Sequence, residues 1–344
     1  MEKRNLTIDI IKLILVLGVV LYHFGGSFPP SYLAGGAFVL PFFFMISGYF
    51  IGRSKNCPNA AKKYFFGCLK YLIFAIVVLF ILEFIDSWIA GRDLQYVIES
   101  VFHPFNNFFY DFVFCNNLTI GGGHGWFLVA LFFIALFHYL CCRFNKTRHY
   151  PVTAIVLLVI SLCLSYFVTQ LHIGEMRGNP VMFNGWIYGL PLWMLGYLYS
   201  SKEIGKKINK YAWAKYLFLA AAILFAYIQT VEYNALKNNS PAFFVSTVFA
   251  AFALLVFTTS FRIPCKAKYW DKRLVFNIYI IHVFVGTKVM EQMDLSDLAR
   301  TFVTFAICIA VCQIYYLLQV LYKKGLIYIK RMRTVQTAPE DPKD

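Results

Sequence analysis

Ten stretches of this chain are long and apolar enough to cross a lipid bilayer as helices. They lie roughly at 6–25, 35–53, 69–90, 125–142, 151–170, 185–200, 213–231, 241–260, 274–291 and 298–321. Of the 344 residues, 60% are hydrophobic and only 14% charged, and the mean hydropathy is +0.62. A soluble domain of this size does not have such a composition. The sequence therefore predicts an all-α, polytopic membrane protein with ten transmembrane helices and no separate soluble domain.

The positive charges indicate how these helices are oriented. Most of the 32 Lys and Arg residues fall at the N-terminus, in alternate loops and in the C-terminal tail. The opposite side holds only Arg92, Arg177, Lys237, Lys288 and Arg300. By the positive-inside rule, both termini of this multi-pass protein are expected in the cytoplasm, at the inner or plasma membrane. The net charge of +15 then reflects the orientation of the helices and contact of the basic residues with anionic membrane lipid. Nucleic acid is not an expected partner.

The predicted domain organisation is simple. Residues 1–325 form one integral-membrane domain, and residues 326–344 form a flexible cytoplasmic tail that is first basic and then acidic. None of the nine cysteines has zinc-finger or redox spacing, and Cys115 alone lies on the outer side. The chain has no HExxH, Walker or dinucleotide motif either. We expect no bound metal or cofactor.

The first hydrophobic run contains three ionisable residues, which are costly in lipid and usually functional. Lys12 and His23 are eleven residues apart, so on a helix they lie within about 20° of one another and about 16 Å apart along the axis. Asp9 precedes Lys12 by one turn and can pair with it. One helix stripe therefore carries an ion pair near one membrane face and an imidazole near the other, which suggests a path or an active site.

Five segments in this order resemble the acyltransferase 3 family of integral-membrane O-acyltransferases. The first is Asp9-x2-Lys12-x10-His23, and the second is Pro41-Phe-Phe-Phe-Met-Ile-Ser47-Gly48-Tyr49-Phe50. The others are His124-Gly-Trp126-Phe-Leu128, Gly189-Leu-Pro-Leu-Trp-Met-Leu-Gly196-Tyr197 and Asn277-Ile-Tyr279-Ile-Ile-His282. The likeness covers essentially the whole chain. It implies an enzyme that moves an acyl group, commonly acetyl, from acyl-CoA as co-substrate to a hydroxyl of a cell-surface or lipid-linked glycan.

The resemblance places His23 at the family's essential histidine. A neutral imidazole there would take the proton from the attacking sugar hydroxyl, and a covalent acyl-histidine is the alternative. Lys12, held charged by Asp9, would meet the donor or lock helix packing. The family often has arginines before its third helix, but here the cations are Lys63 and Lys70, which we expect to bind donor phosphates as point charges or to serve only as positive-inside charge.

The remaining candidates are expected to contact substrate. Ser47 would contact the donor, or with Gly48 let the first two helices approach closely. His124 and Trp126 would form the second half of the acceptor site, or act as a cap and an anchor. Arg177 would bind an acidic or phosphate-bearing acceptor, or pair with Glu175 or Asp111, and Asn184 lies in the same outer segment. His282 would line a cavity or hydrogen bond within the core.

A different class of function remains open. The buried charges could instead gate a transporter or flippase for a polar or lipid-linked substrate, although paired broken helices are not evident in the sequence. A transporter would need no acyl-CoA. A membrane sensing or assembly partner with a degenerate site is a third reading, which the intact Asp9, Lys12, His23 and His124 disfavour.

Overall fold

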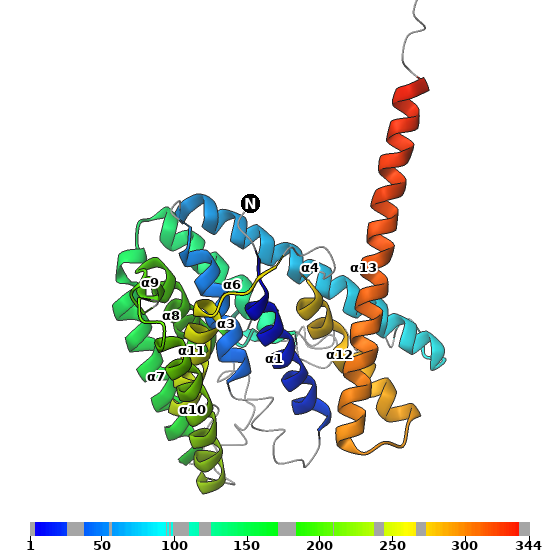
Figure 1. Cartoon of the computed structure of the whole chain (residues 1–344). Helices are drawn as coiled ribbons and strands as arrows, with labels where there is room; N and C mark the ends of the chain where they lie inside the picture. Colours follow the sequence, from blue (N-terminus) through cyan, green and yellow to red (C-terminus); the bar gives the residue numbers. More distant parts are fainter. Residues whose placement is uncertain are drawn as a thin grey trace, which may run out of the picture.

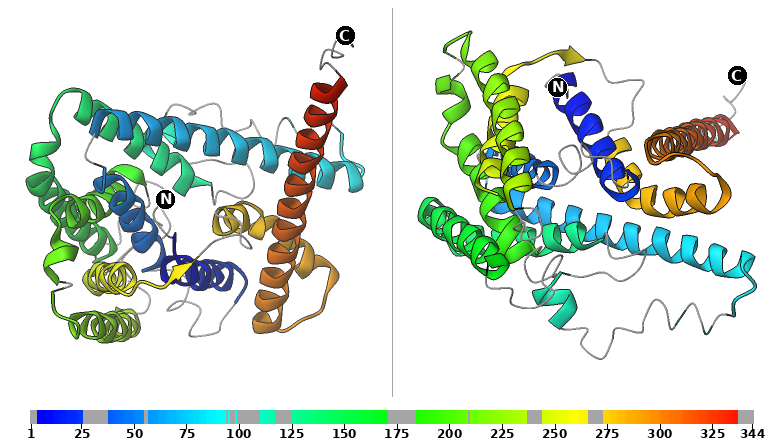
Figure 2. Two further views of the ribbon diagram at one scale, coloured as in Figure 1. Left: turned by 45° about the horizontal axis from the view of Figure 1, so that its top comes forward. Right: turned by 90° about the horizontal axis from the view of Figure 1, so that it is seen from below.

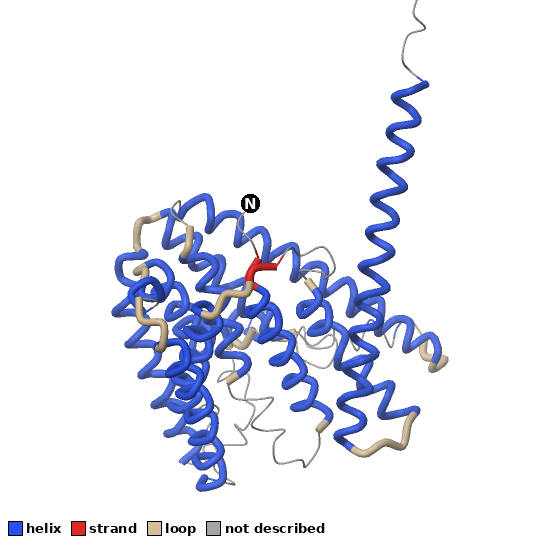
Figure 3. Tube along the Cα trace, in the orientation of Figure 1, coloured by secondary structure: helices blue, strands red, loops and turns tan. Residues whose placement is uncertain are grey.

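The computed structural model describes residues 4–25, 38–54, 57–93, 95, 98, 110–116, 125–170, 184–208, 210–236, 244–265 and 273–336. These residues are almost entirely helical, which confirms the all-α part of the predicted fold class (Figure 3). Within them, β1 (Arg4–Asn5) pairs antiparallel with β2 (Pro264–Cys265) and ties the start of the chain to a distant loop.

Ten main helices match the ten predicted segments. They are α1 (Leu6–Phe24), α3 (Val39–Gly52), α4 (Cys57–Ile89), α6 (Trp126–Arg143), α7 (Tyr150–Gln170), α8 (Leu190–Ser201), α10 (Ala214–Leu236), α11 (Val245–Ser260), α12 (Leu274–Gln292) and α13 (Asp297–Gln336). Short elements are the 3-10 turn Thr147–His149, α9 (Ile204–Ile208) and the π-helical turns Tyr110–Phe114 and Gly185–Gly189. Seven described helices are long and apolar enough to span a membrane, whereas α3 and α11 are shorter apolar helices. The count of ten spans is therefore not established.

Two groups of helices form the bundle (Figures 1 and 2). The helices α7, α8, α10 and α11 gather on one side, and α12 and α13 lie on the other. The long α4 runs across the molecule between them, and α13 projects well past the other helices. It remains helical to Gln336, beyond residue 325 where the tail was expected to start.

The helix α4 begins about twelve residues before the predicted span at 69–90 and contains 33 residues. Its extra turns hold alanine and lysine, which are good helix formers, and Pro58 lies in the first turn where it costs no hydrogen bond. The helix ends two residues before Gly91, which has a φ of 68° and can adopt this left-handed conformation without strain. Hydropathy located the apolar part of α4 but not the basic turns before it.

Glycine permits a very close helix contact between α3 and α8. A Cβ on Gly48 would overlap the Trp193 carbonyl oxygen, and one on Gly196 would overlap the Met45 carbonyl oxygen. Gly48 was expected to bring α3 close to α1. It packs against α8 instead, so the small residues serve a different pair of helices from the one predicted.

An ion-pair network joins α4 to α12 near the end of α4. The Asp86 carboxylate pairs with the Lys288 ammonium and lies 3.8 Å from the Arg92 guanidinium. Lys288 also pairs with Glu291 at 2.7 Å. Asp86 is thus neutralised by two cations, which favours a structural role for this acid.

Candidate active site

A cavity of about 430 Å³ lies among α1, α3, α4, α6 and α12. It is lined by Lys12, Val16, Leu40, Phe43, Ser47, Lys63, Tyr64, Gly67, Cys68, Tyr71, Phe127, Leu128, Leu131, Val275, Phe276 and Tyr279. The lining is mostly apolar with a few polar groups, as in small-molecule sites of this size. Three residues singled out in the sequence, Lys12, Ser47 and Lys63, therefore meet at one cavity although they come from three helices.

Two cations border this cavity. Lys12 is half-buried on α1, and its Nζ atom lies 5.6 Å from the centre of the Phe50 ring, a cation–π contact. Lys63 is exposed on α4 and reaches the cavity edge. Lys70, also exposed on α4, does not line the cavity. Asp9 is half-buried one turn before Lys12, and its role in holding Lys12 charged stays a prediction.

A short hydrogen-bond chain fixes the polar wall of the cavity. The indole Nε1 of Trp193 donates to the Tyr64 hydroxyl oxygen at 3.2 Å, and the Tyr64 and Ser47 hydroxyl oxygens are 2.8 Å apart. An indole N–H can only donate, so Tyr64 is free to direct its own proton to Ser47. Tyr64 was not singled out in the sequence, although it directly follows Lys63.

At the far end of α1, His23 meets His282 of α12. The centres of the two imidazole rings are 5.2 Å apart, and the ring planes are inclined by 56°. His23 is exposed in the last turn of α1, whereas His282 is completely buried. His282 Nδ1 donates to the Tyr279 carbonyl oxygen at 2.7 Å, because a carbonyl can only accept. The two histidines, 259 positions apart in the chain, therefore form one cluster, and sequence reasoning had not paired them.

The close approach of α1 and α12 at this end depends on Gly286. A Cβ at this position would overlap the ring of Phe24, which follows His23 directly. Phe24 is buried in the resulting space. A glycine one turn after His282 therefore lets the last turn of α1 press against α12 and holds His23 near His282.

Tyr279 connects the histidine pair to the cavity. Its side chain lines the cavity, and its ring centre lies 5.8 Å from that of His282 and 5.7 Å from that of Phe127. Since Tyr279 and His282 are one turn apart on α12, the cavity and the histidine pair adjoin. The stripe predicted on α1 thus runs from the cavity at Lys12 to the histidine pair at His23.

The other predicted residues have structural contacts where they are described. Asn184 is buried and caps the next turn, since its Oδ1 accepts from the backbone N–H groups of Trp186 and Ile187 at 2.9 and 2.8 Å. Trp126 is half-buried, with its ring centre 6.2 Å from that of Phe44. His124 and Arg177 lie outside the described residues. Substrate binding by these four residues stays a prediction.

Comparison with known proteins identifies the family. The family model of the acyltransferase 3 family, described as an acyltransferase domain, matches residues 5–318. No curated protein and no solved structure shows a significant match to the chain. The match covers nearly all of the sequence, including α1 and the segment of His282, and so confirms the resemblance carried by the five motifs. The chain therefore belongs to the acyltransferase 3 family of membrane acyltransferases.

Proposed function

We propose that this protein is an O-acyltransferase that moves an acyl group, with acetyl as the first to test, from acyl-CoA to a hydroxyl of a cell-surface or lipid-linked glycan. The observation that carries the proposal is the position of His23. It lies at an exposed helix end, against a buried histidine, beside a cavity with two cations at its border. An exposed base at one end of α1 and a cavity with two cations toward the other end suit a transfer between two compartments.

In this mechanism His23 is the catalytic base. The glycan hydroxyl oxygen attacks the thioester carbonyl carbon, and His23 removes the hydroxyl proton as the new C–O bond forms. The C–S bond then breaks, and the CoA thiolate takes up that proton as it leaves. The alternative of an acyl-histidine intermediate uses the same residue as nucleophile. His282, held by its hydrogen bond to Tyr279, acts as a positioning residue for the His23 ring.

The donor occupies the cavity in this proposal. Lys63 at its exposed edge meets the phosphates of CoA as a point charge, and Lys12 attracts the carbonyl oxygens or phosphates deeper inside. The apolar walls, rich in Phe and Leu, accommodate the pantetheine arm and the acyl chain. The rise of α1 between Lys12 and His23, about 16 Å, is comparable to the reach of an extended pantetheine arm.

The test is transfer of label from radiolabelled acetyl-CoA to total cell-envelope glycans by the purified protein in lipid nanodiscs. His23→Ala should reduce transfer by about 10² to 10⁴-fold, the usual contribution of a general base. His149→Ala is the matched control, because His149 is exposed between α6 and α7 and lies outside the cavity. It should retain full activity.

Two outcomes would contradict the proposal. Undiminished transfer by a correctly folded His23→Ala protein would exclude His23 as the base. The transporter would instead be favoured if the protein, reconstituted in closed lipid vesicles, moved a lipid-linked glycan across the membrane without acyl-CoA and without label transfer.

A further inference from the structure

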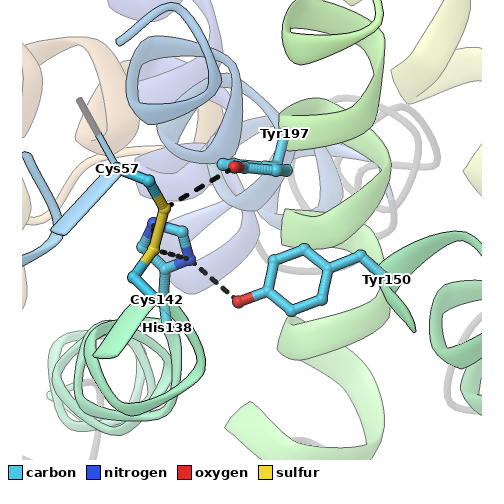
Figure 4. Close-up of a disulfide and its surroundings, with 5 residues drawn as sticks. All are labelled: Cys57, His138, Cys142, Tyr150 and Tyr197. Carbon is cyan, nitrogen blue, oxygen red and sulfur yellow. Dashed lines mark hydrogen bonds between the residues drawn. A yellow bond between two sulfur atoms is a disulfide. The ribbon is translucent and has the colours of Figure 1, made fainter. Parts of the chain in front are cut away.

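A second cluster of reactive side chains lies away from the active site. Cys57 is the first residue of α4, whereas His138 and Cys142 lie one turn apart near the end of α6 (Figure 4). One ligand atom from each of the three lies within 4.8 Å of the other two. His138 is fully buried and Cys142 nearly so. In this structure the two cysteines are joined as a disulfide with 5.9 Å between their Cα atoms.

The imidazole of His138 lies between the Tyr150 hydroxyl and the Cys142 sulfur. Its Nδ1 lies 2.9 Å from the Tyr150 hydroxyl, and the Cys142 sulfur lies 3.6 Å from Nε2 and 3.9 Å from Nδ1. When Nδ1 donates to Tyr150, Nε2 keeps the lone pair that a metal ion needs. Metal-binding histidines are usually held by such a hydrogen bond from the other ring nitrogen. Two ligands of a tetrahedral zinc ion, one sulfur and one nitrogen, are about 3.5 Å apart, close to the observed separation.

The predicted topology places this cluster in the cytoplasm, where glutathione keeps thiols reduced. Two glutathione molecules would open the disulfide to two cysteine thiols and form oxidised glutathione, which balances two electrons and two protons. A divalent cation would then displace the two thiol protons. We propose that Cys57, Cys142 and His138 form a zinc-binding site in the reduced protein, and that the disulfide is its oxidised, metal-free form.

Charge and surroundings suit this assignment. Two thiolates and a neutral imidazole around Zn²⁺ have no net charge, so the complex can be buried at low cost, unlike the free thiolates. Aromatic rings enclose the ligands: the ring centres of Trp193 and Tyr197 lie 4.8 and 5.1 Å from that of His138. The Tyr197 hydroxyl, 3.9 Å from the Cys57 sulfur, can donate a hydrogen bond to a thiolate.

The site would also brace the active-site cavity. It ties the first residue of α4 to α6, and both helices line the cavity. His138 contacts Trp193, which in turn donates to Tyr64 on the polar wall of the cavity. The structure thus assigns the bound ion a position from which it fixes the beginning of α4, six residues before Lys63.

The test uses the full chain in detergent, reduced with a phosphine and stripped with EDTA, and titrated with Co²⁺ as a spectroscopic probe. We expect one cobalt per chain with a sulfur-to-cobalt charge-transfer band, displaced by one equivalent of Zn²⁺. Cys57→Ser and Cys142→Ser should lose the band. Cys141→Ser, the neighbouring cysteine, should keep it and so serves as the matched control.

A measurement on the unaltered protein avoids the risk that a variant fails to fold. Zn²⁺ should protect Cys57 and Cys142, but not Cys141, from maleimide, as read by mass spectrometry. The proposal is overturned if the reduced protein shows no thiolate band, or if the band survives in both serine variants. It is also overturned if Cys57 and Cys142 are found oxidised in cells quenched directly in acid. None of these readouts depends on acyl transfer.

Discussion

The two faces of α3 differ sharply in how closely they are packed. One face, with Gly48 and Gly52, lies so close to the backbone of α8 that no Cβ fits. The other, with Phe43 and Ser47, borders the 430 Å³ cavity. Ser47 and Gly48 are neighbours in sequence, so a rotation of about 100° along the helix separates the closed face from the open one. Rigid packing on one side therefore holds a cavity open on the other.

The closed face should be the more sensitive to mutation. In Gly196→Val the new side chain would overlap the Met45 carbonyl, and backbone cannot move aside as a flexible side chain can. We expect a loss of about 3 kcal/mol of stability, near the upper end for overpacking, with little folded protein recovered. Gly325→Ala is the control, since nothing lies near a Cβ at this position of α13. Size-exclusion profiles and thermal unfolding in detergent would measure the stability of both variants. A normal profile for Gly196→Val would show that α3 and α8 are not packed this closely.

The contact that positions His23 comes next. Gly286→Ala should push the Phe24 ring away from α12 and separate His23 from His282. The protein should still fold, because a ring at a helix end can shift, but acyl transfer should fall by about tenfold or more, as expected when a reacting group is misplaced by about 1 Å. The kinetics of label transfer would show this as a lower kcat. An unchanged kcat would mean that the histidine pair does not need this contact.

On the open face, charge should matter more than packing. Lys12→Met retains the length of the side chain but removes its charge from the cavity. We expect KM for acyl-CoA to rise about tenfold, which corresponds to about 1.4 kcal/mol. Lys62→Met, on the exposed surface of α4 and outside the residues that line the cavity, should leave KM unchanged. Equal effects of the two substitutions would show that the lysines act only through general positive charge.

The smallest effect is expected at the polar wall. Ser47→Ala removes one hydroxyl from the 2.8 Å hydrogen bond with Tyr64, whose oxygen still accepts from Trp193. Stability should fall by only about 1 kcal/mol. Thermal unfolding would detect this change. Loss of the folded protein would mean that the cavity wall tolerates substitution as poorly as the contact between α3 and α8.

The helices themselves were predictable because an apolar stretch of sufficient length directly reports a membrane helix. The prediction was less accurate where a helix is longer or shorter than its apolar stretch. At α4 the basic turns before residue 69 continue the helix, and α8 is completed only by the π-helical turn at Gly185–Gly189 that Asn184 caps. Hydropathy contains no information on which helices pack together, so the partner of Gly48 was predicted wrongly.

The candidate site was predictable only along single helices. The spacing of Lys12 and His23 predicted their shared stripe, because both lie on one helix with known geometry. The pairing of His23 with His282, the Tyr64 wall and the joining of Cys57 to Cys142 depend on contacts between distant segments. The sequence contains one local signal for the cluster of Cys57, His138 and Cys142. His138 and Cys142 are four residues apart and therefore lie on one helix face.

The length of α4 has a consequence for how the protein sits in lipid. Its 33 residues span about 50 Å, whereas the hydrocarbon layer is about 30 Å thick. The surplus turns are the basic ones, with Lys62 and Lys63 exposed, so they belong at the depth of the lipid headgroups. We therefore expect the part of the cavity wall at Lys63 to lie at the headgroup layer, where a charged, water-soluble molecule can insert its apolar end while its charged end stays in water.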